Sequence, residues 1–403
     1  MKLALSTLKY LPYWGAAITL LLLPLQGLWL QDAFIPWQAH VLVIFGALVL
    51  FAIGWSLVGL LRAKHSFAGV DTLVLVFIGF VFLSFLWTEA PDNYLRGLRY
   101  SIFAPLLYFV GRASTLLTSE TGFPWEKILK FSFYSVGVVA ALQWLFWQID
   151  AGQLLETLKL SMEHWAGEWP RLQGSLPGPN QLATFLMVAS LWLFWRGYLS
   201  SWLLAAAAVL VVLTLSRSAI LGLAVGLVVP YLVIQLPQGA KSKMAMLVVV
   251  AASLAIATVF LVEPLRRNFV EERHTAERLE TWGQVKARFA AATPTELLIG
   301  HGPGTAGPGS LLHDDPFIPE NWFLQIVYEY GIVGLGLILV TWGALLVFAY
   351  RNKSSPLVAL ILGVGVNSLF LHPLSDNTFT AMWFYLLLGL GYNLNNEKGT
   401  HRA

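Results

Sequence analysis

Two arginines stand where a protein at a membrane surface could bind an anion. Arg217 lies between two serines at the start of an apolar stretch, and Arg278 lies in a long segment rich in charged residues. The forked guanidinium group suits bidentate binding of phosphate, so two separated arginines could hold a diphosphate and stabilise it as a leaving group. The alternatives are snorkelling for Arg217 and, for Arg278, a solvated helix face paired with Glu271 or Glu277.

The candidate proton acceptors are one glutamate and two histidines. Glu320 and Asn321 stand directly before an apolar stretch, where a carboxylate at the mouth of a cavity could act as a general base. The alternative is a polar pair that caps the start of a helix. His301 and His313 are further candidates in the same segment, and their spacing favours neither.

A glycine-rich stretch precedes these residues. The backbone N–H groups around Gly300, Gly302 and Gly304 could bind an oxyanion, and the alternative is a plain flexible loop. The stretch lacks the Lys-Ser/Thr ending of a nucleotide-binding P-loop, which disfavours an ATPase.

The residues give little support for a metal or a cofactor. His313, Asp314 and Asp315 could ligate a divalent cation, but adjacent carboxylates in a loop are more often solvated. No HExxH or other zinc-binding spacing is present, and the chain has no cysteine. We therefore predict no metal site and no cofactor.

The composition is that of a membrane protein. Hydrophobic residues make up 57% of the chain, charged residues make up 12%, and the mean hydropathy is +0.68. The net charge of +3 reflects the arrangement of cations around the membrane, so no nucleic-acid partner is predicted.

Twelve apolar stretches are candidate membrane spans. They are 11–30, 40–61, 72–88, 100–111, 130–148, 181–196, 199–214, 218–235, 243–262, 322–349, 356–371 and 378–394. The first lacks a small-x-small cleavage site and is interpreted as a retained helix, and the short one at 100–111 is expected to include flanking residues. We predict an all-α polytopic membrane protein with about 12 transmembrane helices and a single integral membrane domain over residues 1–403.

The cations between the spans predict the topology. Lysines concentrate on the side that holds both termini, whereas the opposite side has only Lys159 and Lys286 but nine arginines. Because short loops rich in Lys and Arg mark the cytoplasmic side, both termini are predicted there, with segments 150–180 and 264–321 outside. The second segment is predicted to be a large outer loop between the ninth and tenth spans. It is expected to include an amphipathic helix.

Three blocks resemble the bacterial O-antigen ligase and O-antigen polymerase superfamily of membrane glycosyltransferases. They are RLQGSLPGPNQLA from Arg171, LSRSAILG from Leu215, and a third block with IGHGPG from Ile299, ENWFL from Glu320 and EYGIVG from Glu329. Their order, spacing and shared place on one membrane face carry the resemblance.

The resemblance implies an inverting, metal-independent glycosyltransferase of the GT-C type in the bacterial inner membrane. It would move a glycan from undecaprenyl diphosphate to an acceptor hydroxyl on the periplasmic side, in lipopolysaccharide or other polysaccharide biosynthesis. Arg217 and Arg278 match the arginines that hold the donor diphosphate, and Arg171 joins them as a candidate. Membrane lipid and a chain-length regulator are further partners that the resemblance implies.

The chain departs from the family's pattern at Glu320, where ligases commonly have the histidine of a His-Asn pair. A glutamate can still accept a proton, so two enzymes stay open. A polymerase joins lipid-linked repeat units, and a ligase moves the glycan onto lipid A-core or another acceptor; Glu320 slightly favours the polymerase. The alternative of another class, a transporter or flippase, is disfavoured because most charges lie at the membrane faces.

Overall fold

The computed structural model describes residues 10–22, 36–63, 67, 69–89, 91–116, 123–151, 153, 163–164, 170–235, 272–312, 316–375 and 378–400. Its helices are α2 (Leu11–Leu22), α4 (Pro36–Arg62), α5 (Val70–Leu83), α6 (Pro91–Leu98), α7 (Ala104–Leu116), α8 (Trp125–Gln148), α10 (Pro179–Trp195), α11 (Ser201–Leu213), α12 (Arg217–Pro230), α15 (Glu272–Ala291), α16 (Pro294–Ile299), α17 (Trp322–Arg351), α18 (Ser355–Ser368) and α19 (Thr378–Thr400). Shorter helical turns are η2 (Ser84–Leu86), η3 (Arg99–Phe103), η4 (Tyr231–Gln235) and η6 (Gly307–Leu312). The strands β1 (Glu163–His164) and β2 (Pro170–Arg171) pair antiparallel and are the one departure from an all-α fold in the described part.

The helices follow the predicted apolar stretches closely. Each predicted span overlaps a helix, except that 243–262 and the second part of 11–30, residues 23–30, lie outside the described residues. Four helices in the described part are long and apolar enough to cross a membrane, namely Val43–Arg62, Trp125–Gln148, Arg217–Ile234 and Trp322–Arg351, and five shorter helices are also apolar. The helical fold with candidate membrane spans is therefore confirmed. The total of 12 spans, the single domain over 1–403 and the outer placement of 150–180 and 264–321 stay predictions.

The short stretch at 100–111 is extended by its neighbours, as expected. Helix α6, the π-helical turn η3 and helix α7 follow one another without a break from Pro91 to Leu116. The π turn η3 connects the polar helix α6 directly to the apolar helix α7.

Glycines allow the central helices to approach closely. Gly111 on α7 faces Leu386 on α19, and Gly389 on α19 faces Tyr108 on α7, so a Cβ atom at either glycine would clash with the opposing carbonyl oxygen. Small residues at helix interfaces are the usual way for membrane helices to gain packing energy, because lipid supplies no hydrophobic drive between helices.

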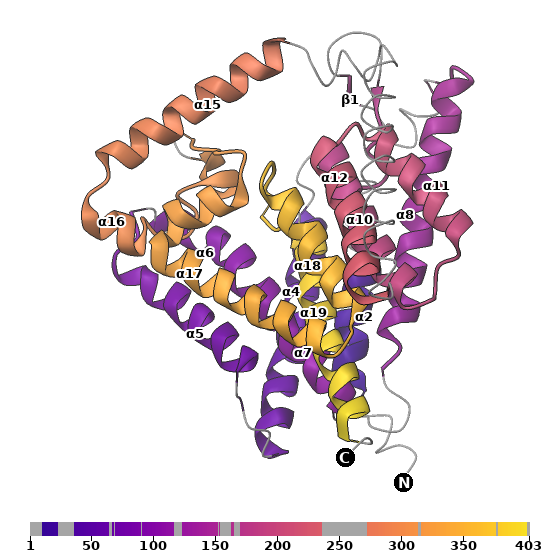
Figure 1. Cartoon of the computed structure of the whole chain (residues 1–403). Coiled ribbons are helices and arrows are strands. Elements are labelled where there is room, and N and C mark those ends of the chain that lie inside the picture. The colour runs from indigo at the N-terminus through magenta and orange to yellow at the C-terminus, as the bar shows by residue number, and fades with distance from the viewer. Residues whose placement is uncertain are drawn as a thin grey trace.

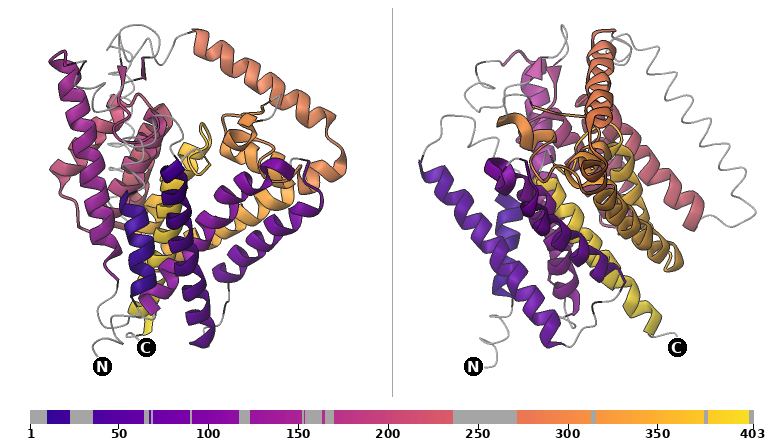
Figure 2. Two further views of the ribbon diagram at one scale, coloured as in Figure 1. Left: turned by 180° about the vertical axis from the view of Figure 1, so that it is seen from behind. Right: turned by 90° about the vertical axis from the view of Figure 1, so that its left-hand side faces the viewer.

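The bundle has two distinct ends. The start of α2 and the end of α19 lie at the same end, and helix α15 lies across the opposite end (Figures 1 and 2). Segment 264–321 contains the helix α15, in which Val285 is buried and Trp282 is 55% exposed; its amphipathic role at the membrane stays a prediction. Which side of the membrane each end faces stays a prediction.

Candidate functional site

The first block of the resemblance is locked to the second by a buried arginine. Arg171 is 8% exposed; its Nε atom donates to the carbonyl oxygen of Thr214 at 2.9 Å, and its NH2 group donates to Oδ1 of Asn180 at 2.9 Å. Thr214 is three residues before Arg217. The guanidinium group of Arg171 thus contacts the residue three positions before Arg217, and the diphosphate binding expected of Arg171 stays a prediction.

The same block is also tied to helix α18. The carbonyl oxygen of Asn180 accepts from the hydroxyl of Thr184 at 2.8 Å, and Oγ1 of Thr184 accepts from Nδ2 of Asn367 at 3.0 Å. Asn367 is fully buried near the end of α18. A chain of polar contacts therefore runs from Arg171 to the last turn of α18.

Arg217 lies at this same end of α18. A Cβ atom on Gly222 would lie 2.5 Å from the carbonyl oxygen of Gly363, and one on Gly226 would lie 2.9 Å from that of Ala359. The contact of α12 moves from Gly222 to Gly226 while its partner on α18 moves from Gly363 back to Ala359, so the two helices are antiparallel. One helical turn back along α12 brings its first residue, the half-buried Arg217, level with the last turn of α18.

The start of α17 completes the site. Asn321 caps α17 by accepting from the N–H of Leu324 at 3.0 Å, and its Nδ2 atom donates to the carbonyl oxygen of Leu369 at 2.8 Å. The N–H of Trp322 donates to the carbonyl oxygen of Leu371 at 3.1 Å. Residues 320–322 thus lie along the segment that leaves α18, so the structure brings Glu320 and Arg217 to one end of the bundle.

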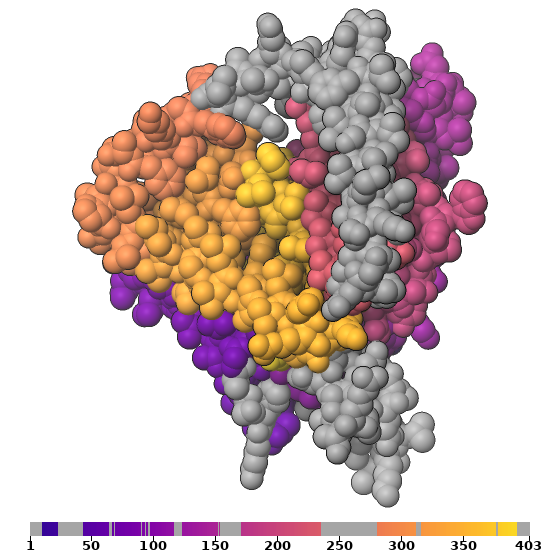
Figure 3. Space-filling model, viewed as in Figure 1, coloured from indigo at the N-terminus to yellow at the C-terminus, as the bar shows by residue number. Residues whose placement is uncertain are grey.

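Helix α15 lies across this end of the bundle (Figure 1). The surface is hollowed between the orange α15 and the yellow ends of α18 and α19 (Figure 3). Helix α15 includes Arg278, but the side chain of Arg278 lies outside the described residues, as does His313. Their expected roles at the donor diphosphate and as a proton acceptor stay predictions.

Backbone strain marks both sides of the site. Leu215, two residues before Arg217, has a φ of 57°, and Glu320 has a φ of 49°. Non-glycine residues rarely adopt this left-handed region, at a cost of about 1–2 kcal/mol each. Such strain persists where surrounding contacts hold the chain, and it clusters at functional positions.

The glycine stretch is neither a free oxyanion cradle nor a flexible loop. The N–H of Gly302 donates to the backbone oxygen of Glu329, and the N–H of Gly304 donates to the carboxylate of Glu329 at 2.9 Å. The N–H groups of Gly300 and His301 donate to Glu296 and Tyr328. The oxyanion role proposed for this stretch is therefore not supported, because its donors already serve protein acceptors.

The glycine stretch packs against α17 where that helix bends. Gly331 has a φ of 65° and interrupts the helical geometry of α17, and a Cβ atom there would clash with the carbonyl oxygen of Leu298 on α16. Glu329, buried at 2% exposure, then receives the glycine stretch. Sequence reasoning assigned Glu329 no role, although a lone carboxylate inside an apolar stretch was the available signal.

His301 contacts Tyr328 and Glu89 in the described part of the chain. Its ring stacks on Tyr328 at 4.3 Å, and its Nδ1 atom lies 2.9 Å from Oε2 of Glu89. Its role as a proton acceptor stays a prediction.

Sequence reasoning missed His372. It follows Leu371, whose carbonyl oxygen pairs with the start of α17; the imidazole is 3% exposed, and its Nε2 atom has no hydrogen-bond partner in the described part of the chain. Burial lowers the pKa of His372 to about 3, so the ring is neutral at physiological pH. A His-Pro pair between the last two apolar stretches was the only signal in the sequence.

Burial of His372 predicts a loss of stability in mild acid. The unfolded histidine takes up a proton below its ordinary pKa of about 6.5, whereas the folded one stays neutral down to about 3. The stabilising effect is therefore complete above pH 6.5 and is lost as the pH falls, by about 2 kcal/mol between pH 7 and pH 5. Unfolding of the purified protein in detergent, followed at both pH values, should show this loss for the wild type and not for His372→Gln. Equal losses in the two proteins would contradict the prediction.

The fold and site together define a class. The described part is a bundle of apolar helices with a half-buried arginine and a strained glutamate at one end, as expected of a membrane enzyme that handles an anionic substrate. Residues 199–339 match the model of the O-antigen ligase family, a region that runs from α11 into α17 and includes Arg217, Arg278 and Glu320. This match confirms the resemblance to the O-antigen ligase and polymerase superfamily and supports ligase- or polymerase-type glycosyl transfer at a membrane. No curated protein matches the chain.

Proposed function

We propose that this protein moves a glycan from undecaprenyl diphosphate to an acceptor hydroxyl on the periplasmic face of the bacterial inner membrane. The observation that carries the proposal is the placement of Arg217 and Glu320 beside the same segment, the end of α18. A cation for the donor and a base for the acceptor are the two groups that this reaction needs. No metal and no cofactor are assigned to the transfer itself.

Arg217 is the proposed diphosphate-binding residue. It is the first residue of the 14-residue helix α12, where the helix dipole favours an anion. Arg278 on α15, across the hollow, is the proposed second clamp. Arg171 holds the peptide before Arg217 in place through Thr214, and so positions the clamp.

Glu320 is the proposed general base. Its carboxylate takes the proton of the acceptor hydroxyl while the hydroxyl oxygen attacks the anomeric carbon of the donor glycan. The bond from that carbon to the diphosphate oxygen breaks, and the electron pair leaves with undecaprenyl diphosphate. Attack opposite the leaving group inverts the anomeric centre. The arginines stabilise the negative charge that develops on the diphosphate.

The acceptor separates the two proposed enzymes. Because Glu320 stands where ligases commonly have histidine, we favour a second lipid-linked repeat unit as acceptor, which makes the protein a polymerase that could work with a chain-length regulator. A ligase would instead use lipid A-core or another acceptor.

A reconstituted assay distinguishes these reactions. The purified protein in liposomes is given labelled lipid-linked repeat units alone, and then with lipid A-core added. We expect a ladder of longer lipid-linked products from the donor alone. Product that forms only with lipid A-core would establish the ligase, and donor that stays intact in both arms would refute glycosyl transfer. Arg217→Ala protein is the matched control for contaminating activity.

A further inference from the structure

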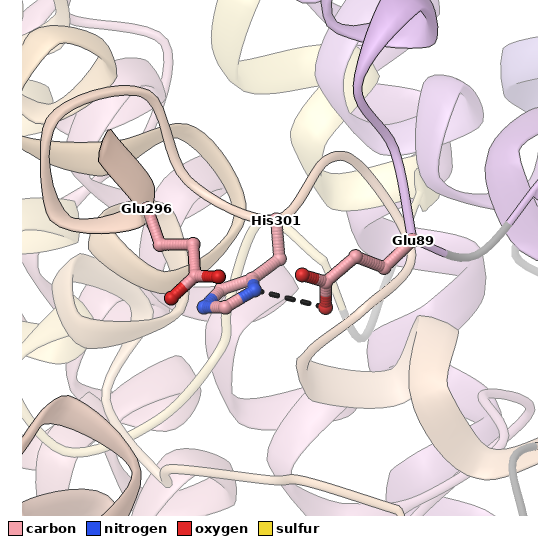
Figure 4. A group of neighbouring side chains, drawn as sticks. All are labelled: Glu89, Glu296 and His301. Atoms are coloured by element: carbon pink, nitrogen blue, oxygen red, sulfur yellow. Dashed lines mark ion pairs between the residues drawn. The ribbon is translucent and has the colours of Figure 1, made fainter. Parts of the chain in front are cut away.

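Three metal-ligating side chains converge outside the proposed transfer site. Glu89 follows the turn η2, Glu296 lies in α16, and His301 lies in the glycine stretch (Figure 4). One ligand atom from each lies within 4.8 Å of the others. Figure 4 shows the imidazole of His301 between the two carboxylates, which come from segments far apart in the sequence.

His301 and Glu89 are held by one another and by their surroundings. The N–H of Glu89 donates to the carbonyl oxygen of His301 at 3.0 Å, and Oε2 of Glu89 lies 2.9 Å from Nδ1 of the imidazole. The N–H of His301 donates to Tyr328, and its ring stacks on that tyrosine at 4.3 Å with an angle of 25° between the planes. The backbone and the ring of His301 are therefore both fixed.

Glu296 is held by a capping box. Its Oε2 atom accepts from the N–H of Thr293 at 2.6 Å, and its own N–H donates to the hydroxyl of Thr293. The N–H of Gly300 donates to the backbone oxygen of Glu296 at 2.7 Å, which ties α16 to the glycine stretch. Partners that orient ligands in this way are a regular feature of metal sites.

The geometry points to a binding site for one divalent transition-metal ion, with zinc as the best fit, formed by Glu89, Glu296 and His301. Two carboxylates and one neutral imidazole carry a formal charge of −2, which a divalent cation balances. A nitrogen ligand favours zinc over magnesium and calcium, which prefer oxygen alone. Ligand atoms in a tetrahedral zinc site lie about 3.3 Å apart, and Oε2 of Glu89 already lies 2.9 Å from Nδ1 of His301.

The ion would join three segments into one unit. It would fix the turn before α6, helix α16 and the glycine stretch, and the glycine stretch in turn rests on Glu329 of α17. This inference does not rest on the proposed glycosyl transfer, because it uses only the positions of the three ligands and of the residues that contact them. The alternative to a metal ion is an ion pair between His301 and the carboxylate of Glu89.

Metal titration tests the site. Full-length protein in detergent is treated with EDTA, dialysed, and titrated at pH 7.5 with zinc chloride by calorimetry, with magnesium chloride as comparison. We expect one zinc ion per chain, with binding weakened at least about tenfold by Glu89→Gln and by His301→Asn. The exposed Asp92→Asn on nearby α6 is the matched control and should bind zinc like the wild type.

A variant beyond the ligands sharpens the test. Thr293→Ala removes the hydroxyl that orients Glu296 while leaving all three ligands, and is expected to weaken zinc binding by about 10- to 100-fold. Zinc should also raise the unfolding temperature of the wild type and not that of Glu89→Gln. Absence of stoichiometric zinc binding, or equal binding by Glu89→Gln and Asp92→Asn, would refute the metal site. The ion pair between His301 and Glu89 would then be the explanation of this cluster.

Discussion

Replacing Arg217 with alanine is expected to reduce glycan transfer by about 1000-fold or more. Arg217 is the first residue of α12. An arginine that stabilises a departing phosphate raises the rate of transfer by a factor of this size. Lysine at this position should restore little, because a point charge does not reproduce bidentate binding. Arg278→Ala is expected to have a similar effect if α15 supplies the second clamp.

The measurement for Arg217 is initial rate of transfer at saturating lipid-linked donor, with protein abundance in the membrane measured in parallel. Arg62→Ala is the matched control, since Arg62 is exposed at the end of α4 and is not part of the proposed site. Near-normal rates for both Arg217→Ala and Arg278→Ala would remove the diphosphate clamp from the mechanism.

Replacing Glu320 with glutamine should lower turnover by at least about 100-fold. Glutamine keeps the shape of the side chain but does not accept a proton at neutral pH, and loss of a general base has an effect of this size. The structure makes the comparison clean, because the side chain that caps α17 belongs to Asn321 and is untouched. A purely structural role would change stability by only about 1 kcal/mol and leave turnover close to that of the wild type.

Aspartate and histidine at position 320 complete the series in the same assay. A His variant that retains activity would link this position to the histidine of the ligases. A Gln variant with full activity would exclude Glu320 as the base and direct attention to His372, which lies in the segment beside the start of α17.

The sequence predicted the helices and the residue types of the site. Apolar stretches of the right length form helices almost wherever they are packed, because the backbone must satisfy its own hydrogen bonds in an apolar environment. The start of α12 at Arg217, the start of α17 after Glu320 and the amphipathic α15 all follow from local patterns. These features depend on neighbours within a few residues.

Only the tertiary structure decided which residues meet. The antiparallel register of Gly222 and Gly363 brings Arg217 to the end of α18, and no local pattern encodes that pairing. Packing also places the guanidinium group of Arg171 against the carbonyl oxygen of Thr214. Packing likewise brings the N–H group of Gly304 to the carboxylate of Glu329. Contacts between distant segments depend on how side-chain volumes pack in three dimensions, and a polar group excluded from water must pair with whichever partner that packing brings near.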